Sequence, residues 1–294
     1  HEIPFFHVVC ANDLFDLDVV YLAVAGNPEV EFDLYAEHVI RGDITTADGT
    51  VLAKTTVSDD GSETREYPYG RMFAHVVGYT NNGKGGLESQ YNFNLLRSHS
   101  FFLTQIINDL KNKKNIGDTL VTTLDYDVQE TAYKALGDRD GAVVVMEVKT
   151  GKILALVSKP DFDPNTLAER WDDIVSDENS SVLLNRVTSG LYPPGSTFKI
   201  FTTLEYVHEN SNYQDYSFDC EGELNVDGNE IHCYHKAVHG KETLKDSFAN
   251  SCNTSFSNIG LSLDISGFRN LCEDMLFNKK LPGSLAGSKS SFTL

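Results

Sequence analysis

The sequence predicts an α+β protein of two domains, and three observations predict this class. The chain has 294 residues, which suffices for about two domains of ordinary size. Its hydrophobic content of 40% can fill packed cores. Strand pairs open both halves of the chain, at residues 39–53 and 142–158, and mostly helical sequence follows residue 164. The second domain thus begins with strands, continues with helices and is expected to lack its later part.

The charge of the chain excludes nucleic acid as a partner. A total of 43 acidic residues against 24 basic ones gives a formal net charge of -19. Such a surface repels phosphate backbones and lacks the basic cluster that attracts anionic membranes. The sequence has no apolar run long enough for a membrane-spanning helix, and it shows no basic segment with a cleavage site. Neither a membrane anchor nor an export signal is therefore visible.

The first domain is expected over residues 38–118, because residues 1–37 show no clear period and are left unassigned. It opens with two apolar runs that flank Asp48-Gly49, a dipeptide typical of a tight hairpin turn. The basic, polar end of residues 101–115 is typical of a surface linker.

A helix is expected over residues 87–96, after the glycine-rich stretch 81–86. Glu88 lies at the start of this helix and could be mistaken for a catalytic acid. We expect it instead to form a structural ion pair or a helix cap in the first domain.

The second domain is expected over residues 119–294. Asp125 is a suitable N-cap for a helix whose apolar residues share one face. Residues 142–148 and 152–158 are rich in β-branched side chains, so they are expected to form two strands with both faces covered. A β-like insertion at about residues 220–239 interrupts the helical sequence that follows.

Ser196 and Lys199 give the sharpest chemical signal. Two prolines and a glycine precede Ser196 and a helical pattern follows it, which places Ser196 in a first helical turn with Lys199 on the same face. A serine hydroxyl becomes a good nucleophile when a base removes its proton, and a lysine can be that base when burial lowers its pKa. The positive end of the helix dipole would favour an oxyanion there. The alternative is a surface helix that carries this spacing by chance.

Ser251 and Asn253 form the second signal, in a loop after a predicted helix over residues 244–250. Two residues apart, their side chains can point the same way. The hydroxyl can then relay a proton, while the amide holds a substrate carbonyl or the lysine. The alternative is an ordinary turn or helix cap, in which serine and asparagine are common.

The order of these two signals resembles that of the first two active-site motifs in the penicillin-binding proteins and serine β-lactamases. Four further segments resemble the class B penicillin-binding proteins in the right order, so the resemblance spans residues 36–294. They are Arg41-Gly42-Asp43-Ile44 with Asp48-Gly49 and Leu52-Ala53; Gly83 to Glu88 with Tyr91; Leu124-Asp125 with Gln129; and Gly151 to Ala155 with Asp163-Pro164-Asn165.

The resemblance implies an N-terminal pedestal-like domain followed by an incomplete transpeptidase domain of the serine β-lactamase type. It implies a peptidoglycan D,D-transpeptidase in which Ser196 is the nucleophile, Lys199 its base, Ser251 a proton relay and Asn253 a holder of the substrate amide. No metal or organic cofactor is implied. The expected partners are peptidoglycan stem peptides, β-lactams, a membrane polymerase, and division or elongation proteins. The expected location is the outer face of the bacterial cytoplasmic membrane.

Two other functions remain open. One is a serine β-lactamase or β-lactam sensor, which the segments before residue 119 disfavour because a small β-lactamase has no such domain. The other is a non-catalytic cell-wall scaffold that binds division or elongation partners.

The family's third motif is not found after Asn253. Lys149-Thr150-Gly151 has the right letters but precedes Ser196, and its glycine suits a hairpin turn, so we assign it to the turn. The real motif is expected beyond Leu294, and with it a backbone N–H group of the oxyanion hole. The chain as given is therefore expected to be inactive or barely active.

The five cysteines are scattered and do not form a disulfide framework. Cys220 and Cys233 either pair around a loop or remain unpaired thiols. With Cys220 nearby, four residues form a Cys/His-rich patch in which a zinc site is conceivable. They are His232, Cys233, His235 and His239. Their spacing fits no finger or ribbon pattern, so a polar loop is preferred.

Overall fold

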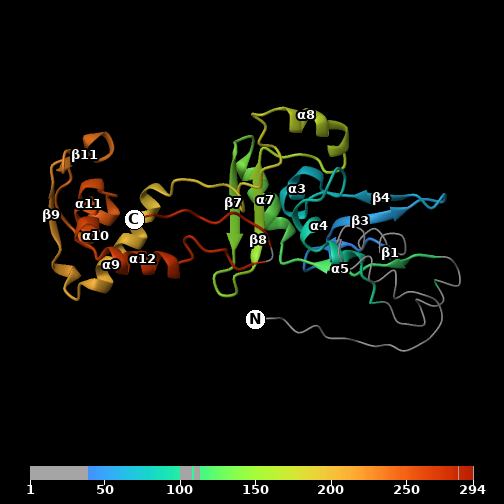
Figure 1. Cartoon of the computed structure of the whole chain (residues 1–294), viewed down its shortest axis with the longest axis horizontal. Helices are drawn as coiled ribbons and strands as arrows, with labels where there is room; N and C mark the ends of the chain where they lie inside the picture. Colours follow the sequence, from blue (N-terminus) through green and yellow to red (C-terminus); the bar gives the residue numbers. More distant parts are fainter. Residues whose placement is uncertain (1–38, 100–107, 109–112, 284, 294) are drawn as a thin grey trace, which may run out of the picture. The chain divides into compact units, whose positions relative to one another are not determined.

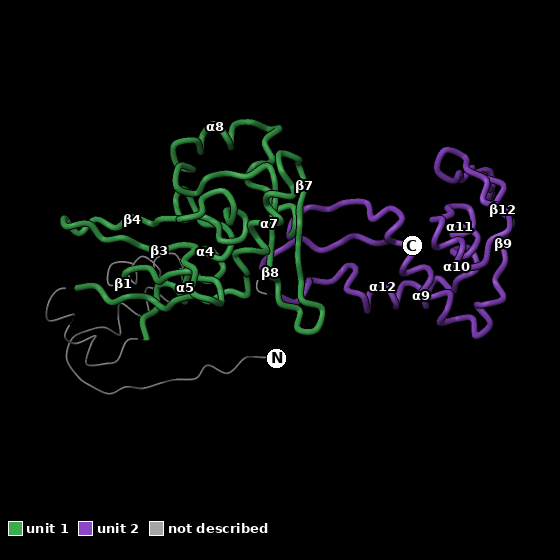
Figure 2. The backbone as a smooth tube through the Cα atoms, turned by 180° about the vertical axis from the view of Figure 1, so that it is seen from behind, with its two compact units in different colours: residues 1–187 green, residues 188–294 purple. Residues whose placement is uncertain are grey.

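The computed structural model describes residues 39–99, 108, 113–283 and 285–293. They belong to two compact units, residues 1–187 and 188–294 (Figure 2). The unassigned segment 1–37 lies outside the described residues, as do residues 111 and 112 of the basic, polar stretch 111–115 that was expected to be a linker. Asn115, at the end of that stretch, lies in a short strand. The domain boundary expected near residue 119 falls within the first unit and stays a prediction.

The first unit combines short strands with short helices (Figure 1). Its sheets are a four-stranded sheet in the order β4-β3-β2-β6, a parallel pair β1-β5 and an antiparallel pair β7-β8. The elements are β1 (Val39–Ile40), β2 (Ile44–Thr45), β3 (Val51–Val57), β4 (Glu63–Glu66), η1 (Gly70–Phe73), α3 (Ala74–Val77), α4 (Gly86–Gln90), α5 (Asn92–Leu96), β5 (Asn115–Ile116), β6 (Leu120–Val121), α7 (Tyr126–Leu136), β7 (Gly141–Met146), β8 (Ile153–Lys159), η2 (Leu167–Arg170) and α8 (Trp171–Ser176).

The hairpin expected at the start of the first domain is confirmed. Strands β2 and β3 are antiparallel, and Gly49 in the turn has a φ of 91°, which a glycine adopts without strain. Ile44 and Leu52 on the paired strands are fully buried. The helix expected over residues 87–96 forms as two short helices, α4 and α5, which meet at Tyr91.

Glu88 forms the structural ion pair that its sequence context indicated. Its carboxylate is fully buried and accepts hydrogen bonds from Arg41 Nε at 2.6 Å and Arg65 Nε at 2.8 Å. Gly42, next to Arg41, must be small, because a Cβ there would lie 2.1 Å from the backbone oxygen of Asp118. The Arg-Gly segment thus joins strand residues of the first unit to helix α4.

The predicted helix and strand pair of residues 125–159 are also confirmed. Asp125 caps α7, since its side chain accepts a hydrogen bond from Val128 N at 3.0 Å. Lys149-Thr150-Gly151 lies in the exposed turn between β7 and β8, and Gly151 has a φ of 73°. The prediction that both faces of these strands are covered is wrong for β7. Its residues alternate between partly buried and exposed within the described part of the chain, because α7 packs on only one face.

The second unit has helices and an all-β insertion. Two antiparallel pairs, β9-β12 and β10-β11, form the insertion that was expected at residues 220–239. The elements are η3 (Gly195–Phe198), α9 (Lys199–Glu209), η4 (Tyr213–Asp215), β9 (Ser217–Cys220), β10 (Glu223–Val226), β11 (Asn229–His232), η5 (Tyr234–Lys236), β12 (Gly240–Thr243), α10 (Leu244–Ala249), α11 (Asn253–Ser262) and α12 (Ile265–Asp274).

Candidate active site

Ser196 lies in η3, which continues directly into α9, the helix that Lys199 opens. The first helical turn predicted for Ser196 is therefore a 3-10 turn. Ser196 itself is exposed. An aromatic cluster packs against this segment: the ring centroid of Phe198 lies 5.3 Å from that of Phe292 and 5.7 Å from that of Phe277. The nucleophile candidate is thus exposed, next to a packed aromatic cluster.

Lys199 is the centre of the site. Its Nζ donates hydrogen bonds to the backbone oxygen of Ser251 at 2.5 Å, to Ser251 Oγ at 3.0 Å and to Asn253 Oδ1 at 2.7 Å. Burial lowers the pKa of Lys199, and the neighbouring Cys252 and Cys233 oppose this effect. A lower pKa favours the neutral amine that a base requires.

Ser251 connects Lys199 to Ser196. Its hydroxyl donates to Ser196 Oγ at 2.9 Å and accepts from Lys199 Nζ at 3.0 Å. The sequence placed the lysine as a direct base toward Ser196, whereas the hydrogen bonds reach Ser196 through Ser251. Ser251 also has a φ of 51°, an uncommon conformation for a residue with a Cβ, so the surrounding structure must hold it there.

Helix α10 and strand β12 provide part of that support. Thr243 and Asp246 form a reciprocal capping box at the start of α10, which ends beside the Ser251 loop. Under the loop, Glu242 is buried and its Oε1 accepts a hydrogen bond from Asn250 Nδ2 at 2.7 Å. The role of Glu242 was not predicted from the sequence, in which its only signal is its position next to Thr243, the N-cap of α10.

The structure brings the four predicted site residues together in the second unit. Ser196, Lys199, Ser251 and Asn253 form one chain of hydrogen bonds. In this arrangement Asn253 holds the lysine, one of the two contacts that the sequence allowed for its amide. Asn253 Nδ2 donates to the backbone oxygen of His232 at 2.9 Å.

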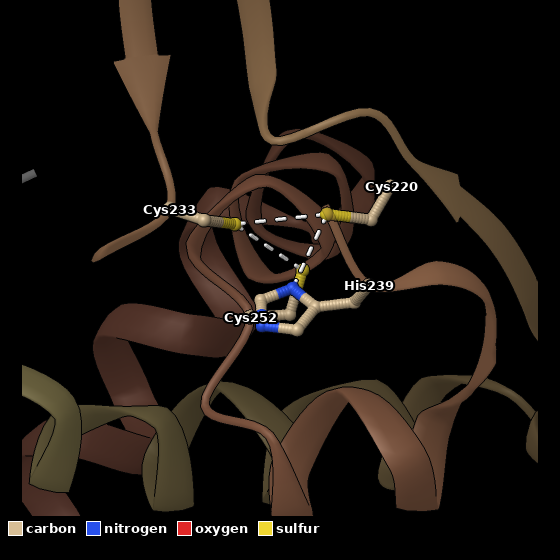
Figure 3. A group of neighbouring side chains, drawn as sticks. All are labelled: Cys220, Cys233, His239 and Cys252. Carbon is tan, nitrogen blue, oxygen red and sulfur yellow. Dashed lines mark hydrogen bonds between the residues drawn. The ribbon is translucent and has the colours of Figure 1, made fainter. Parts of the chain in front are cut away.

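The Cys/His-rich segment does not behave as the polar loop that was preferred. Cys220 and Cys233 are buried free thiols, and their sulfur atoms converge with Nδ1 of His239 and the sulfur of Cys252 (Figure 3). The sequence patch did not include Cys252. His235 is exposed and outside this group, and His232 lies near the carboxylates of Glu223 and Glu230 instead.

Two family models match the chain. Residues 141–293 match the penicillin binding protein transpeptidase domain, and residues 41–120 match the penicillin binding protein A dimerisation domain. The chain is 34% identical over 258 residues to the peptidoglycan D,D-transpeptidase PbpA of Mycolicibacterium smegmatis, covering 80% of this chain and 52% of that protein.

Solved structures give the same picture. The D,D-transpeptidase domain of a peptidoglycan glycosyltransferase from Eggerthella lenta is 31% identical with a TM-score of 0.74, and the match covers 86% of this chain and 57% of that one. The imipenem acyl-enzyme complex of penicillin-binding protein A from M. tuberculosis is 27% identical with a TM-score of 0.78, and the match covers 88% of this chain and 63% of that one.

The chain spans about half the length of the curated relatives it matches. Among the residues that the structure describes, every helix is too short or too polar to cross a membrane.

Proposed function

Because this chain belongs to the class B penicillin-binding proteins, we propose that it carries the serine, lysine and Ser-x-Asn elements of a peptidoglycan D,D-transpeptidase. The observation that carries this proposal is the hydrogen-bond path from Ser196 Oγ through Ser251 Oγ to Lys199 Nζ, with steps of 2.9 and 3.0 Å. A base must lie within hydrogen-bond reach of the proton it removes, directly or through one intermediary, and this path meets that condition.

Proton movement follows from the contacts of Lys199. As an ammonium, its three protons match the three acceptors it contacts, two on Ser251 and one on Asn253. Loss of one proton, which burial favours, leaves a lone pair for the Ser251 hydroxyl. Ser251 can then donate to Lys199 and accept the proton of Ser196. Asn253 keeps the amine in place throughout.

The acyl transfer has two steps. Ser196 Oγ attacks the carbonyl carbon of the penultimate D-Ala of a stem peptide, the peptide C–N bond breaks, and the terminal D-Ala leaves with the proton held by Ser251 and Lys199. The amine of a neighbouring stem peptide then attacks the ester, and Ser196 Oγ regains a proton. A β-lactam would acylate the same oxygen as a mimic of the acyl-D-Ala-D-Ala end.

The proposed substrate indicates where the activity takes place, and the resemblance indicates the partners. Peptidoglycan lies outside the cytoplasmic membrane, so we place the activity on its outer face. The match of residues 41–120 to a dimerisation domain supports a non-catalytic role for this region in assembly. A membrane polymerase and the division or elongation proteins are the partners that the resemblance implies, and they stay predictions.

The test is intact mass after incubation with benzylpenicillin, on the 294-residue chain and on the protein as its gene encodes it. Each is compared with its Ser196→Ala variant and with Ser189→Ala, a second serine of the same unit. We expect one penicilloyl mass on the encoded protein and on Ser189→Ala, and none on Ser196→Ala.

Other outcomes favour the other functions. If neither protein is labelled, the catalytic proposal fails and the scaffold replaces it. If the label is lost within seconds and nitrocefin is turned over rapidly, water resolves the acyl-enzyme and the chain is a β-lactamase.

A further inference from the structure

We propose that Cys220, Cys233, His239 and Cys252 bind a zinc ion, and that this metal holds the Ser251–Asn253 segment of the catalytic loop in place. Their four donor atoms, three sulfurs and one imidazole nitrogen, all lie within 4.8 Å of one another (Figure 3). Thiolate and imidazole are the ligands that zinc prefers in structural sites, whereas calcium and magnesium prefer oxygen.

The distances between the donor atoms fit a tetrahedron around one zinc ion. A Zn–S bond of about 2.3 Å places two sulfurs of a tetrahedral site about 3.8 Å apart, and a Zn–N bond of about 2.0 Å places sulfur and nitrogen about 3.5 Å apart. The Sγ atoms of Cys220 and Cys233 are 3.7 Å apart, as are those of Cys233 and Cys252. Cys220 Sγ and His239 Nδ1 are 3.3 Å apart.

The backbone of the all-β insertion brings distant residues to this point. In the β10-β11 hairpin Glu223 pairs with His232, so Cys220 and Cys233 lie at its open end. In the β9-β12 pair, Cys220 lies opposite Gly240, which places His239 beside Cys220. Two antiparallel pairings therefore position three ligands before any metal binds.

Cys252 supplies the fourth ligand from helix α11. It is the N-cap residue of this helix, and Ser255 N donates to its sulfur at 3.4 Å. The buried hydroxyl of Thr254 donates to Cys220 Sγ at 3.2 Å and lies 3.3 Å from Cys252 Sγ. Such donors to ligating sulfurs orient them and offset their negative charge.

Burial makes this a closed, structural type of site. The three cysteines are at most 3% exposed, and all four positions of the tetrahedron are filled by side chains. A catalytic zinc needs an open position for water or substrate, which this donor set does not leave. The expected role is therefore to hold the backbone.

The metal would act on catalysis through the chain neighbours of Cys252. Ser251 and Asn253 flank it, and both bind Lys199. Asn253 is also tied to the carbonyl of His232, the residue before the ligand Cys233. A metal that joins Cys252 to Cys233 would thus stabilise the unusual φ of 51° at Ser251, which the chain alone does not favour.

The first experiment measures metal content on the protein as its gene encodes it, purified without chelator. We expect one zinc ion per chain after gel filtration, and three protected thiols that become reactive after treatment with a strong chelator. Cobalt(II) added to the metal-free protein should give the absorption of a tetrahedral thiolate complex.

Matched variants identify the ligands. His239→Gln should lose most of the zinc affinity, whereas His235→Gln, an exposed histidine outside the group, should keep it. Cys252→Ser should lose the metal, and Cys272→Ser, a buried cysteine in a separate cluster, should retain it. Removal and restoration of zinc in the unchanged protein give the same information if a cysteine variant fails to fold.

The effect on the active site is measured separately. Metal-free protein with an unchanged circular dichroism spectrum should be acylated by benzylpenicillin about 10- to 100-fold more slowly, since misplacement of a catalytic group by about 1 Å has an effect of this size. Zinc should restore the rate. An equal rate with and without zinc would overturn the holding role.

Metal content and acylation distinguish this inference from the proposed function. Protein that stays metal-free in excess zinc, or a disulfide between any two of the three cysteines, would overturn the zinc site while leaving acylation of Ser196 intact. Stoichiometric zinc without any acylation would support the site, although the proposed function would fail.

Discussion

Asn253 joins the backbone of His232 to Lys199: its Nδ2 donates to the His232 carbonyl at 2.9 Å, and its Oδ1 accepts from Lys199 at 2.7 Å. Both polar atoms of the Asn253 amide therefore form hydrogen bonds.

Asn253→Ala should slow acylation by benzylpenicillin about 100-fold, because Lys199 loses an acceptor and its fixed position. Rapid-quench labelling measures this rate. Asn258→Ala, on the exposed side of the same helix, should acylate normally, and an equal loss there would contradict a specific role of Asn253.

Acylation of Ser196 should depend on the hydroxyl of Ser251 and not on the unusual backbone conformation of that residue. Ser251→Ala and Ser251→Gly both remove the step between Ser196 and Lys199, but only glycine adopts a φ of 51° without strain. Both variants should be acylated about 100- to 10,000-fold more slowly. Thermal unfolding should separate them, with the glycine variant the more stable. Normal acylation of Ser251→Gly would show that the proton takes another path.

Glu88 should be important for the stability of the first unit. Glu88→Gln removes the only charge that Arg41 and Arg65 both contact in the described part of the chain, and leaves two guanidinium groups close together, so the free energy of unfolding should fall by about 3–5 kcal/mol. Fluorescence of Trp171, the single tryptophan, reports urea unfolding of this unit. The control Glu66→Gln, which opens an exposed pair with Lys54, should change little. A similar midpoint for both variants would argue against the buried pair.

His75 should make the first unit less stable in acid. Burial lowers the pKa of His75, whose Nε2 lies 3.0 Å from the Pro160 oxygen, and the charges around it come from Asp161 and Arg186. Below its unfolded pKa of about 6.5 the unfolded chain binds a proton that the native state does not, so stability falls as the pH drops from there toward the lowered native pKa. In His75→Gln, the urea midpoints at pH 7.5 and 5.5 should differ less than in the unchanged protein. An unchanged difference would show that other groups cause the acid sensitivity.

Much of the fold could be predicted from local signals in the sequence. Asp125 as an N-cap and Gly49 in a tight turn depend on neighbours in the chain, and both predictions are confirmed. The exposure of alternate β7 residues within the described part of the chain could not be predicted, because a run of β-branched residues looks the same whether one or both faces are covered.

The site was predictable as a set of residues but not as a network. The spacing of Ser196 to Lys199 and of Ser251 to Asn253 identified the four residues that the structure brings together. The path through Ser251 depends on how two distant segments pack. The convergence of Cys252 with Cys220 depends on two strand pairings and a helix cap, so no local spacing in the sequence could predict it.

The aromatic cluster under Ser196 has a consequence for biosynthesis. Phe198 packs on Phe277 and Phe292, which the ribosome adds long after the serine and the lysine have left the exit tunnel. Until those two rings arrive, the nascent chain holds both reactive residues without the platform that orients them. The segment with Ser196 and Lys199 can therefore take up its packed position only after residues 277 and 292 have been synthesised.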